Sequence, residues 1–368
     1  MIFIKKYVFI SISVLLIIFS AVLFFYFSQN NEADNSTLNG NKNSLSSQNI
    51  SEDDNNISLN HRSPFIPSDE YIFENQVDIV HTPSLGRFCY SHLNKDQQLC
   101  YEKIRKAVEQ HREYLLWNNN CCDFNMLNKI LMYVTFDYPE YFWYSNEGCY
   151  IEYNYSDKVP MKVNFKYEYS RDEVYQINDS IYPEVKKYLE SVSNLTSDYE
   201  RALNAYEYII NNTTYDNIRA NAGYKAFEDM DKEAIPCWNI TGVFINHDAI
   251  CRGYAQAYQY LMNLQGIECG YVYGEGHCWN IIKLDGDWYY VDVTWGDPVT
   301  AISYADTGEV RYVEDGIDYS YFCMTTEQLL QLHTPDAELN PELPQCTATK
   351  YNYFEMNKNS GYKNYFDK

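Results

Sequence analysis

The sequence predicts an α+β fold in which a helix packs on an antiparallel sheet, and three observations in its second half support this prediction. Residues 251–264 carry apolar side chains at helical spacing, and Gly266 behind them is a common helix end. Three short alternating segments follow and are expected to be strands, namely residues 267–273, 277–284 and 288–295. Asp285-Gly286 separates the last two and indicates a two-residue hairpin turn, which makes those strands antiparallel.

The chain begins with an apolar segment. Lys5 and Lys6 precede 21 uncharged and mostly apolar residues, Tyr7 to Phe27, close to the roughly 20 residues that a helix needs to cross a bilayer. A cleaved signal peptide has a shorter apolar region and a small-residue cleavage site, and neither occurs here. We therefore predict that residues 1–27 form an anchor in the cell membrane, with a cytoplasmic N-terminus and an extracellular C-terminal part.

Four further regions follow the predicted anchor. Residues 28–68 are rich in Asn, Ser, Asp and Glu and predict a disordered linker. Residues 69–193 predict a small accessory α+β domain, residues 194–345 a second domain that contains the sheet, and residues 346–368 a C-terminal tail. The expected elements before the sheet are helices at 96–117, 125–136, 171–192 (interrupted by Pro183) and 198–210, and strands at 142–144, 150–155 and 161–169.

The composition excludes one class of partner. The 368 residues carry 51 acidic and 28 basic side chains, a formal net charge of −23, so the basic footprint of a nucleic-acid-binding protein is missing. The chain also contains 38 tyrosines. A stacking surface for sugars or peptides would use such residues, but we favour packing in the core and on strands, which tyrosine suits.

Eleven cysteines fit an exported chain. Disulfides form readily outside the cell, and an odd number leaves at least one thiol free unless chains cross-link. No two cysteines have the CxxC spacing typical of zinc sites. We therefore expect no metal and no other cofactor.

One cysteine has a special position, because Cys251 begins the predicted helix at 251–264. The N-terminus of a helix carries partial positive charge, which stabilises a thiolate over a thiol. Gly253, two residues later, is expected to leave room for a substrate backbone. Cys251 is therefore a candidate nucleophile.

The predicted hairpin brings a histidine and a carboxylate together. A turn at Asp285-Gly286 pairs Leu284 with Asp287, and continuing this register places Asp292 opposite Trp279. His277 is two residues from Trp279 and hence on the same face of the sheet as Asp292, within reach as a diagonal neighbour. A three-residue turn would break this parity.

Cys251, His277 and Asp292 thus form a candidate catalytic triad. The carboxylate can orient the imidazole and stabilise its cation, and the imidazole can take the thiol proton. A metal held by the same three side chains is the less favoured alternative, on ligand spacing.

Three segments around these residues resemble the transglutaminase-like superfamily: residues 249–255 (AICRGYA), 276–280 (GHCWN) and 290–295 (YVDVTW). The resemblance covers about residues 198–298, with weaker matches at Tyr215-Asp216 and Gly242, and residues 69–192 resemble the segment before this domain in some exported bacterial members. It implies a papain-like core with the nucleophile at a helix N-terminus and the other triad residues on adjacent strands.

The resemblance also implies thiol-dependent acyl transfer or hydrolysis, as in a cysteine peptidase, an amidase or a protein cross-linking enzyme. Peptides or proteins, including those of the cell envelope, would be the substrates. The alternative is a non-catalytic cell-surface binding or assembly module on the same fold.

Two details depart from the familiar pattern. Cys278 directly follows the histidine, and strand alternation places it on the opposite face from His277, where it should not compete as a nucleophile. The donors of an oxyanion hole are not obvious. The backbone N–H of Cys251 is one candidate and the indole N–H of Trp238 another.

Overall fold

The computed structural model describes residues 87–117, 122–222, 235–303, 310–314, 316–358 and 364–366. The predicted anchor and linker, residues 1–27 and 28–68, lie outside these ranges. Within the described ranges, no helix combines the length and the apolar character needed to span a bilayer.

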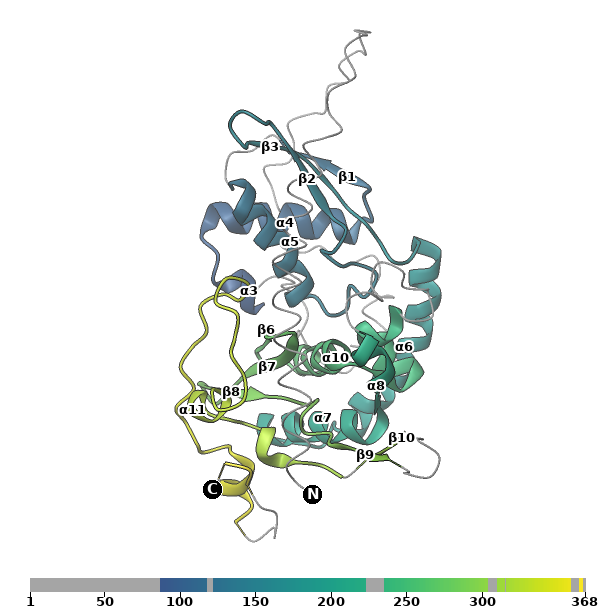
Figure 1. Cartoon of the computed structure of the whole chain (residues 1–368), viewed down its shortest axis with the longest axis vertical. Coiled ribbons are helices and arrows are strands. Elements are labelled where there is room, and N and C mark those ends of the chain that lie inside the picture. The colour runs from purple at the N-terminus through teal and green to yellow at the C-terminus, as the bar shows by residue number, and fades with distance from the viewer. Residues whose placement is uncertain are drawn as a thin grey trace. The chain divides into compact units, whose positions relative to one another are not determined.

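The elements confirm the α+β class, since helices alternate with small, mainly antiparallel sheets (Figure 1). The first half contains α3 (Phe88–Ser91), α4 (Lys95–Glu109), β1 (Tyr114–Leu116), α5 (Phe124–Asp137), β2 (Tyr150–Tyr153), β3 (Pro160–Asn164) and α6 (Arg171–Ser191). The three strands form one antiparallel sheet in the order β1-β3-β2.

Four of the predicted elements in this half are wrong in part, and one of them is the strand expected at 161–169, which ends at Asn164. The helix expected at 96–117 ends at Glu109, because His111 adopts a left-handed backbone (φ 54°) and the chain then continues as β1. The expected strand at 142–144 forms only an isolated bridge, between Tyr144 and Tyr167. Pro183 does not interrupt α6, since it lies on the exposed face, where water can solvate the carbonyl that loses its partner.

The second half contains the elements that surround the candidate triad. Its helices are α7 (Asp198–Asn212), α8 (Asn217–Ala222), η1 (Ile235–Trp238), η2 (Gly242–Asn246), α10 (Cys251–Leu264), η3 (Tyr319–Tyr321), α11 (Thr326–Leu329) and α12 (Tyr353–Met356). Its strands are β4 (Thr214–Tyr215), β5 (Asp248–Ala249), β6 (Cys269–Gly274), β7 (His277–Leu284), β8 (Asp287–Val291), β9 (Val299–Ser303) and β10 (Val310–Glu314). β4 and β5 pair in parallel, and β9 pairs with β10.

Different parts of the chain pack on the two faces of the sheet β6-β7-β8. Helix α10 packs on β6 and β7 (Figure 1), and the side chains of Cys278 and Ile282 lie in the same buried cluster as the helix. Trp279 and Ile281 point to the other face, where the C-terminal segment supplies Leu329 and its neighbours. The two faces therefore belong to two separate apolar clusters, as the alternation of a strand requires.

The predicted hairpin register is confirmed. Leu284 pairs with Asp287, and Asn280 pairs with Val291, so the turn consists of Asp285 and Gly286 alone. Both turn residues have positive φ, 51° and 94°, which a two-residue turn of this kind needs in order to match the strand twist.

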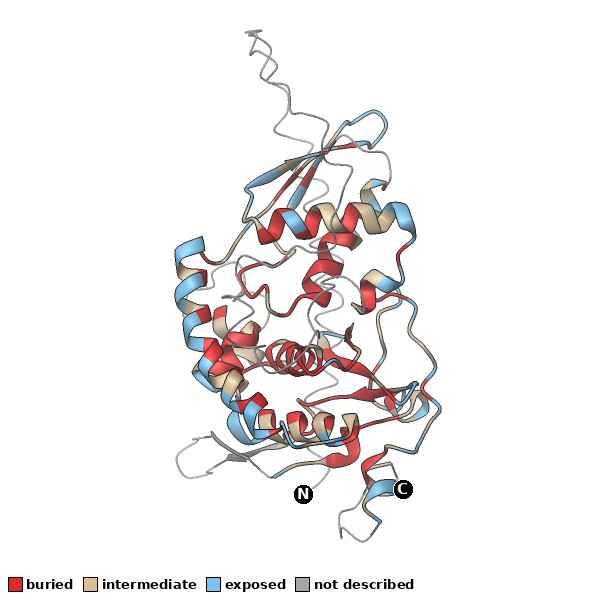
Figure 2. Cartoon of the chain, turned by 180° about the vertical axis from the view of Figure 1, so that it is seen from behind, coloured by how far each residue is buried: buried red, intermediate tan, exposed pale blue. Residues whose placement is uncertain are grey.

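The tyrosines mainly serve packing. Tyr101, Tyr206, Tyr254, Tyr258 and Tyr289 have no exposed surface, and the helices of Figure 2 turn buried faces toward the interior. One buried cluster extends from Cys89 to Tyr353 and draws on both predicted domains. The boundary predicted at 193/194 stays a prediction.

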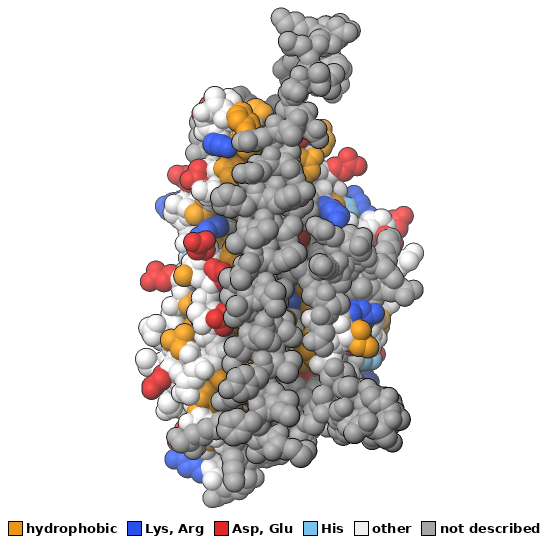
Figure 3. All heavy atoms as spheres, in the orientation of Figure 1, with side chains coloured by type: hydrophobic (Ala, Val, Ile, Leu, Met, Phe, Trp, Pro, Cys, Tyr) orange, Lys and Arg blue, Asp and Glu red, His pale blue; other side chains and the backbone are white. Residues whose placement is uncertain are grey.

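Charged side chains are mixed on the described surface. In the face shown in Figure 3, the described Lys and Arg side chains are scattered among Asp and Glu. The expectation that the chain binds no nucleic acid stays a prediction drawn from its composition.

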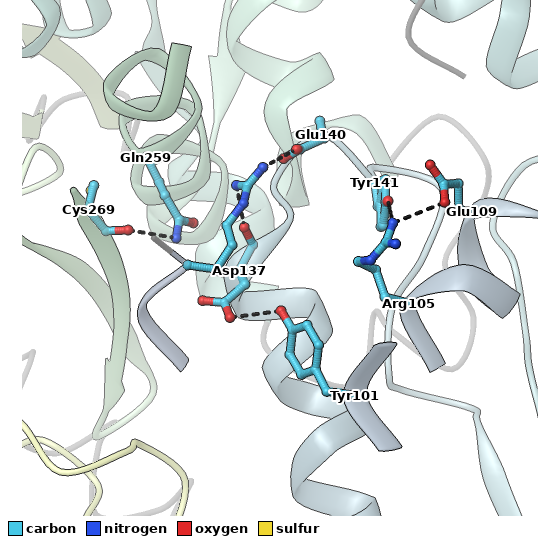
Figure 4. Close-up of polar contacts among 9 residues, drawn as sticks. Tyr101, Arg105, Glu109, Asp137, Glu140, Tyr141, Gln259 and Cys269 are labelled. Carbon is cyan, nitrogen blue, oxygen red and sulfur yellow. Dashed lines mark hydrogen bonds and ion pairs between the residues drawn. The ribbon is translucent and has the colours of Figure 1, made fainter. Parts of the chain in front are cut away.

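A buried carboxylate holds the first helices together (Figure 4). Asp137 accepts hydrogen bonds from the backbone N–H groups of Cys89 and Tyr90, both at 2.9 Å, and from the Tyr101 hydroxyl at 2.8 Å. Burial raises its pKa, and these donors oppose that rise. The Arg87 guanidinium donates to the carbonyl of Asp137. This carboxylate therefore binds the first turn of α3 and a side chain of α4 to the end of α5.

We expect Asp137→Asn to destabilise the protein. The amide offers a single acceptor oxygen, so buried donors lose their partner at a cost of about 1–3 kcal/mol each. Urea unfolding of the purified chain measures this change. Asp179→Asn, on the exposed face of α6, is the matched control and should leave the midpoint unchanged. Equal midpoints for the two variants would contradict the structural role of Asp137.

Candidate active site

Cys251 is the first residue of α10, as the sequence predicts. Ile250 before it is extended and gives the helix no side-chain cap, so the positive end of the helix dipole faces the thiol without a competing side-chain oxygen. The Ile250 N–H donates to the carbonyl of Cys237 at 3.0 Å, which attaches this turn to η1. Local backbone structure thus fixes the position of the nucleophile.

The expectation for Gly253 is wrong. A Cβ atom there would lie 2.9 Å from the carbonyl oxygen of Cys237 and 3.2 Å from that of Asn239. The first distance is too short for a side chain and the second is tight, and the residue is buried. Gly253 therefore allows α10 to pack on η1 and leaves no room there for a substrate.

The structure brings His277 and Asp292 together. The His277 imidazole Nε2 lies 2.7 Å from Asp292 Oδ2. His277 is the first residue of β7, and Asp292 directly follows β8. The other carboxylate oxygen accepts the backbone N–H of Trp295 at 3.0 Å. The Asp292 side chain has no exposed surface, whereas that of His277 is 17% exposed.

Cys251 and His277 also influence each other, because the imidazole lowers the pKa of the thiol and the thiol raises that of the imidazole. Because Nε2 of the imidazole is directed to Asp292, Nδ1 is left for the sulfur. Burial alone would lower the pKa of His277, but the charge and hydrogen bond of Asp292 and the contact with Cys251 raise this pKa to about 10. In turn, the His277 cation holds the pKa of Asp292 well below its ordinary value in spite of burial.

Cys278 contacts the nucleophile as well. A hydrogen bond from the Cys278 thiol is the largest influence that lowers the pKa of Cys251 well below its ordinary value, and the His277 hydrogen bond and charge add to it. The Tyr271 hydroxyl donates to the Cys278 sulfur. Burial and the neighbouring Cys251 raise the pKa of the Cys278 thiol, so Cys278 keeps its proton and acts as the donor.

The predicted alternation of Cys278 is right, and the raised pKa of its thiol agrees with the expectation that it does not compete as a nucleophile. Cys278 does lie on the opposite face from His277. That face is the one that α10 covers, however, and Asn280 on the same face donates to the Ala255 carbonyl of the helix at 3.0 Å. The start of α10 therefore lies at the end of the sheet. At this position Cys251 is close both to His277, which points to one face of β7, and to Cys278, which points to the other.

Sequence reasoning missed His333. Its Nε2 lies 3.0 Å from Asp292 Oδ2, and its ring stacks on Trp279 with centroids 4.8 Å apart. The residue comes after α11, outside all three segments that resemble the superfamily. No spacing in the sequence connects it to the triad, so only the fold could reveal it.

Tyr215 is a second residue that the sequence did not assign to the site. It ends β4, next to β5 and hence near the start of α10. Burial raises the pKa of its phenol well above the ordinary value, and the charges of Cys251 and Cys278 raise it further. The phenol therefore stays protonated near the sulfur and is a candidate oxyanion donor. The roles of the Cys251 N–H and of Trp238 in η1 stay predictions.

Among the described residues, one group has the donors for a metal ion, and it differs from the set considered from the sequence. His277, Asp292 and His333 offer ligand atoms within 4.8 Å of one another, whereas Cys251 is not in the group. The two nitrogen–oxygen distances of 2.7 and 3.0 Å are shorter than the roughly 3.3 Å between ligands on a tetrahedral zinc ion. The His277 distance is that of a hydrogen bond and the His333 distance that of an ion pair, and both are short for two ligands of one metal ion.

The pKa shifts predict an unusual reactivity for Cys251. The pKa of Cys251 is lowered well below its ordinary value and that of His277 is raised to about 10, and both shifts favour a thiolate–imidazolium pair. We expect iodoacetamide to alkylate Cys251 at a nearly constant rate from about pH 6 to 8, where an ordinary thiol gains about tenfold per unit. Peptide mass spectrometry after timed labelling identifies the modified cysteine.

His277→Asn provides the comparison for this profile. Loss of the cation raises the pKa of Cys251, so its alkylation rate at pH 6 should fall by about tenfold or more. The internal control is Cys149, a half-buried thiol whose pKa is raised to about 11, which should label slowly in both proteins. A profile for Cys251 that rises with pH like that of Cys149 would contradict the ion pair.

Cys278 gives a separate prediction. Cys278→Ala removes the donor to the Cys251 sulfur, whereas Cys278→Ser retains one. At pH 6 we expect the alanine variant to be alkylated at Cys251 about tenfold more slowly than the serine variant, the effect of one hydrogen bond to a charged group. The same rate in both variants would show that the thiol of Cys278 does not stabilise the thiolate.

The chain is similar to known proteins over part of its length. The model of the transglutaminase-like superfamily matches residues 186–293. Kyphoscoliosis peptidase of Mus musculus is 28% identical over 116 residues, which cover 27% of this chain and 16% of the relative. The Homo sapiens protein of the same name gives the same values. The matched part is thus a small fraction of these relatives.

A solved structure titled "Crystal structure of a TGase" is 15% identical and covers 44% of this chain and 47% of its own, with a TM-score of 0.30. That structural similarity is low. The family match, in contrast, contains all three candidate triad residues. Over residues 186–293, this chain is therefore similar to the transglutaminase-like superfamily.

Proposed function

We propose that this chain is a thiol-dependent acyl-transfer enzyme whose catalytic residues are Cys251, His277 and Asp292. The observation that carries the proposal is a buried carboxylate 2.7 Å from an imidazole, which in turn lowers the pKa of a thiol at a helix N-terminus. Such an arrangement activates a nucleophile and supplies a general acid.

The reaction begins with the thiolate of Cys251. Its sulfur attacks the carbonyl carbon of a peptide or carboxamide, and the carbonyl oxygen becomes negative. The Tyr215 phenol and the Cys251 backbone N–H are the proposed donors to that oxygen. When the C–N bond breaks, the His277 imidazolium gives its proton to the leaving amine, and a thioester remains on the enzyme.

The second half of the reaction regenerates the thiolate. Neutral His277 takes a proton from water or from an acceptor amine, which attacks the thioester carbonyl as the C–S bond breaks. Water as the acceptor gives a peptidase or amidase, and an amine gives a transglutaminase. The name of the two mammalian relatives, kyphoscoliosis peptidase, favours water and makes hydrolysis the first reaction to test.

The cellular location is part of the same proposal. The length and apolar character of Tyr7 to Phe27 support a membrane anchor that holds the enzyme outside the cell. Peptides or proteins of the cell envelope would then be its substrates. Fractionation of cells, followed by protease treatment of the intact surface, tests this location.

The enzymatic proposal is tested with a peptide library in the presence and absence of a fluorescent alkylamine. We expect cleavage or amine incorporation by the wild-type chain, no product with Cys251→Ala, and a rate about 10²–10⁴-fold lower with His277→Ala, the usual contribution of general acid–base catalysis. Cys149→Ala is the matched control and should retain full activity.

The same assay separates the enzyme from a non-catalytic module. A binding module on this fold would give no product with any library member, and Cys251 would be alkylated no faster than a small free thiol. His277→Ala would then leave the alkylation rate unchanged. That set of results would overturn the proposed function.

A further inference from the structure

Asp292 contacts two histidines through one oxygen. His277 Nε2 lies 2.7 Å and His333 Nε2 3.0 Å from Oδ2, while Oδ1 accepts the Trp295 N–H. The carboxylate has no exposed surface, so protein groups must replace the water that would otherwise solvate it. Of the two histidines, His333 is the one with no part in the proposed reaction.

The ring of His333 is held by aromatic contacts. It stacks on Trp279 with an interplanar angle of 20°, and it meets the edge of Trp295 at 78° with centroids 4.6 Å apart. The side chain is 5% exposed. A ring confined in this way has little freedom to turn, so its Nε2 stays within 3.0 Å of Asp292 Oδ2.

The backbone beyond His333 is fastened to the edge of the sheet. The Asp336 N–H donates to the carbonyl of Tyr273 at 3.0 Å. The Asn340 side chain bonds both to that carbonyl, at 2.6 Å, and to the Tyr273 N–H, at 3.0 Å. A Cβ atom on Gly274 would lie 2.1 Å from the Thr334 carbonyl oxygen. Residues 333–340 thus cover the edge strand β6 at very close range.

The contact between His333 and Asp292 is an ion-pair distance without full hydrogen-bonding geometry, because His333 Nε2 is a buried nitrogen with no aligned acceptor. Contacts of this kind often tighten when substrate binds. Because this nitrogen is buried, water cannot hydrogen-bond to it. The acceptor that lies near it is the carboxylate that orients His277.

We propose that His333 is a positioning residue, which holds the Asp292 carboxylate in the orientation that lets Oδ2 accept from His277 and keeps water away from it. This inference rests on the proposed function of the triad. Residue 333 lies beyond the family match at 186–293, so the C-terminal segment contributes a side chain to a site that the matched domain does not complete alone.

Without His333, the carboxylate is less well oriented and its effect on His277 weakens. The imidazolium is then less stable, and the Cys251 thiolate that it supports gains a proton at higher pH. The pH profile of Cys251 alkylation reports this chain of effects directly, and it requires no knowledge of the substrate.

Two variants of the full chain separate the nitrogen of His333 from its ring. His333→Phe retains an aromatic ring between the two indoles but lacks the nitrogen, whereas His333→Gln places an amide N–H near the carboxylate. For His333→Phe we expect the pH at which Cys251 loses reactivity on the acid side of the alkylation profile to rise by about one unit. This shift lowers the alkylation rate at pH 6 about tenfold. His333→Gln should recover most of that loss, and His92→Gln, at an exposed histidine after α3, is the control.

A wild-type profile for His333→Phe would overturn the proposal, since the residue would then serve packing alone. A loss in His333→Gln as large as that in His333→Phe would overturn it as well. Thermal unfolding of each variant shows whether the fold is intact, and the packing-conserving His333→Phe keeps the test valid if the glutamine variant is unstable. If wild-type Cys251 reacts like a free thiol, the proposed function fails instead.

Discussion

The structure around the candidate site depends on one buried charge, the carboxylate of Asp292. A carboxylate without exposed surface is very costly unless protein groups replace its hydration. Here a hairpin supplies His277, the turn after β8 supplies the Trp295 N–H, and the C-terminal segment places His333 at the same oxygen. Each of these elements must be in position for the charge to be tolerated, so the charge in turn specifies how they meet.

The charge of Asp292 influences the protonation of the other two triad residues in turn. Asp292 favours the cation of His277, and this cation together with the Cys278 thiol favours the thiolate of Cys251. The nucleophile lies where the N-terminus of α10 meets the end of the sheet, so it receives support from both faces. Neither face alone would provide an imidazole and a second donor, because adjacent strand residues point in opposite directions.

The C-terminal segment has a role beyond covering the sheet. It buries Trp279 on the face opposite α10, and its residues 333–340 bind the backbone of Tyr273 in the edge strand β6. An edge strand left open is a site for unwanted pairing. The same attachment places His333 beside Asp292. One segment therefore both protects the edge strand and helps to organise the site.

The sequence by itself determined the parts of the site that depend on local rules. Helical spacing placed Cys251 at the start of a helix, and the two-residue turn set the parity that brought His277 and Asp292 to one face. Both follow from periodicity and turn chemistry, which act over a few residues.

The tertiary structure decided which side chains from different helices and strands come into contact. The contact of Cys278 with the nucleophile depends on which face α10 covers, and Gly253 proved to be a packing residue because η1 lies against the helix. The approach of His333 and Tyr215 depends on segments about 40 residues away from the triad in either direction. Such contacts arise from the packing of whole elements, which no short-range pattern in the chain encodes.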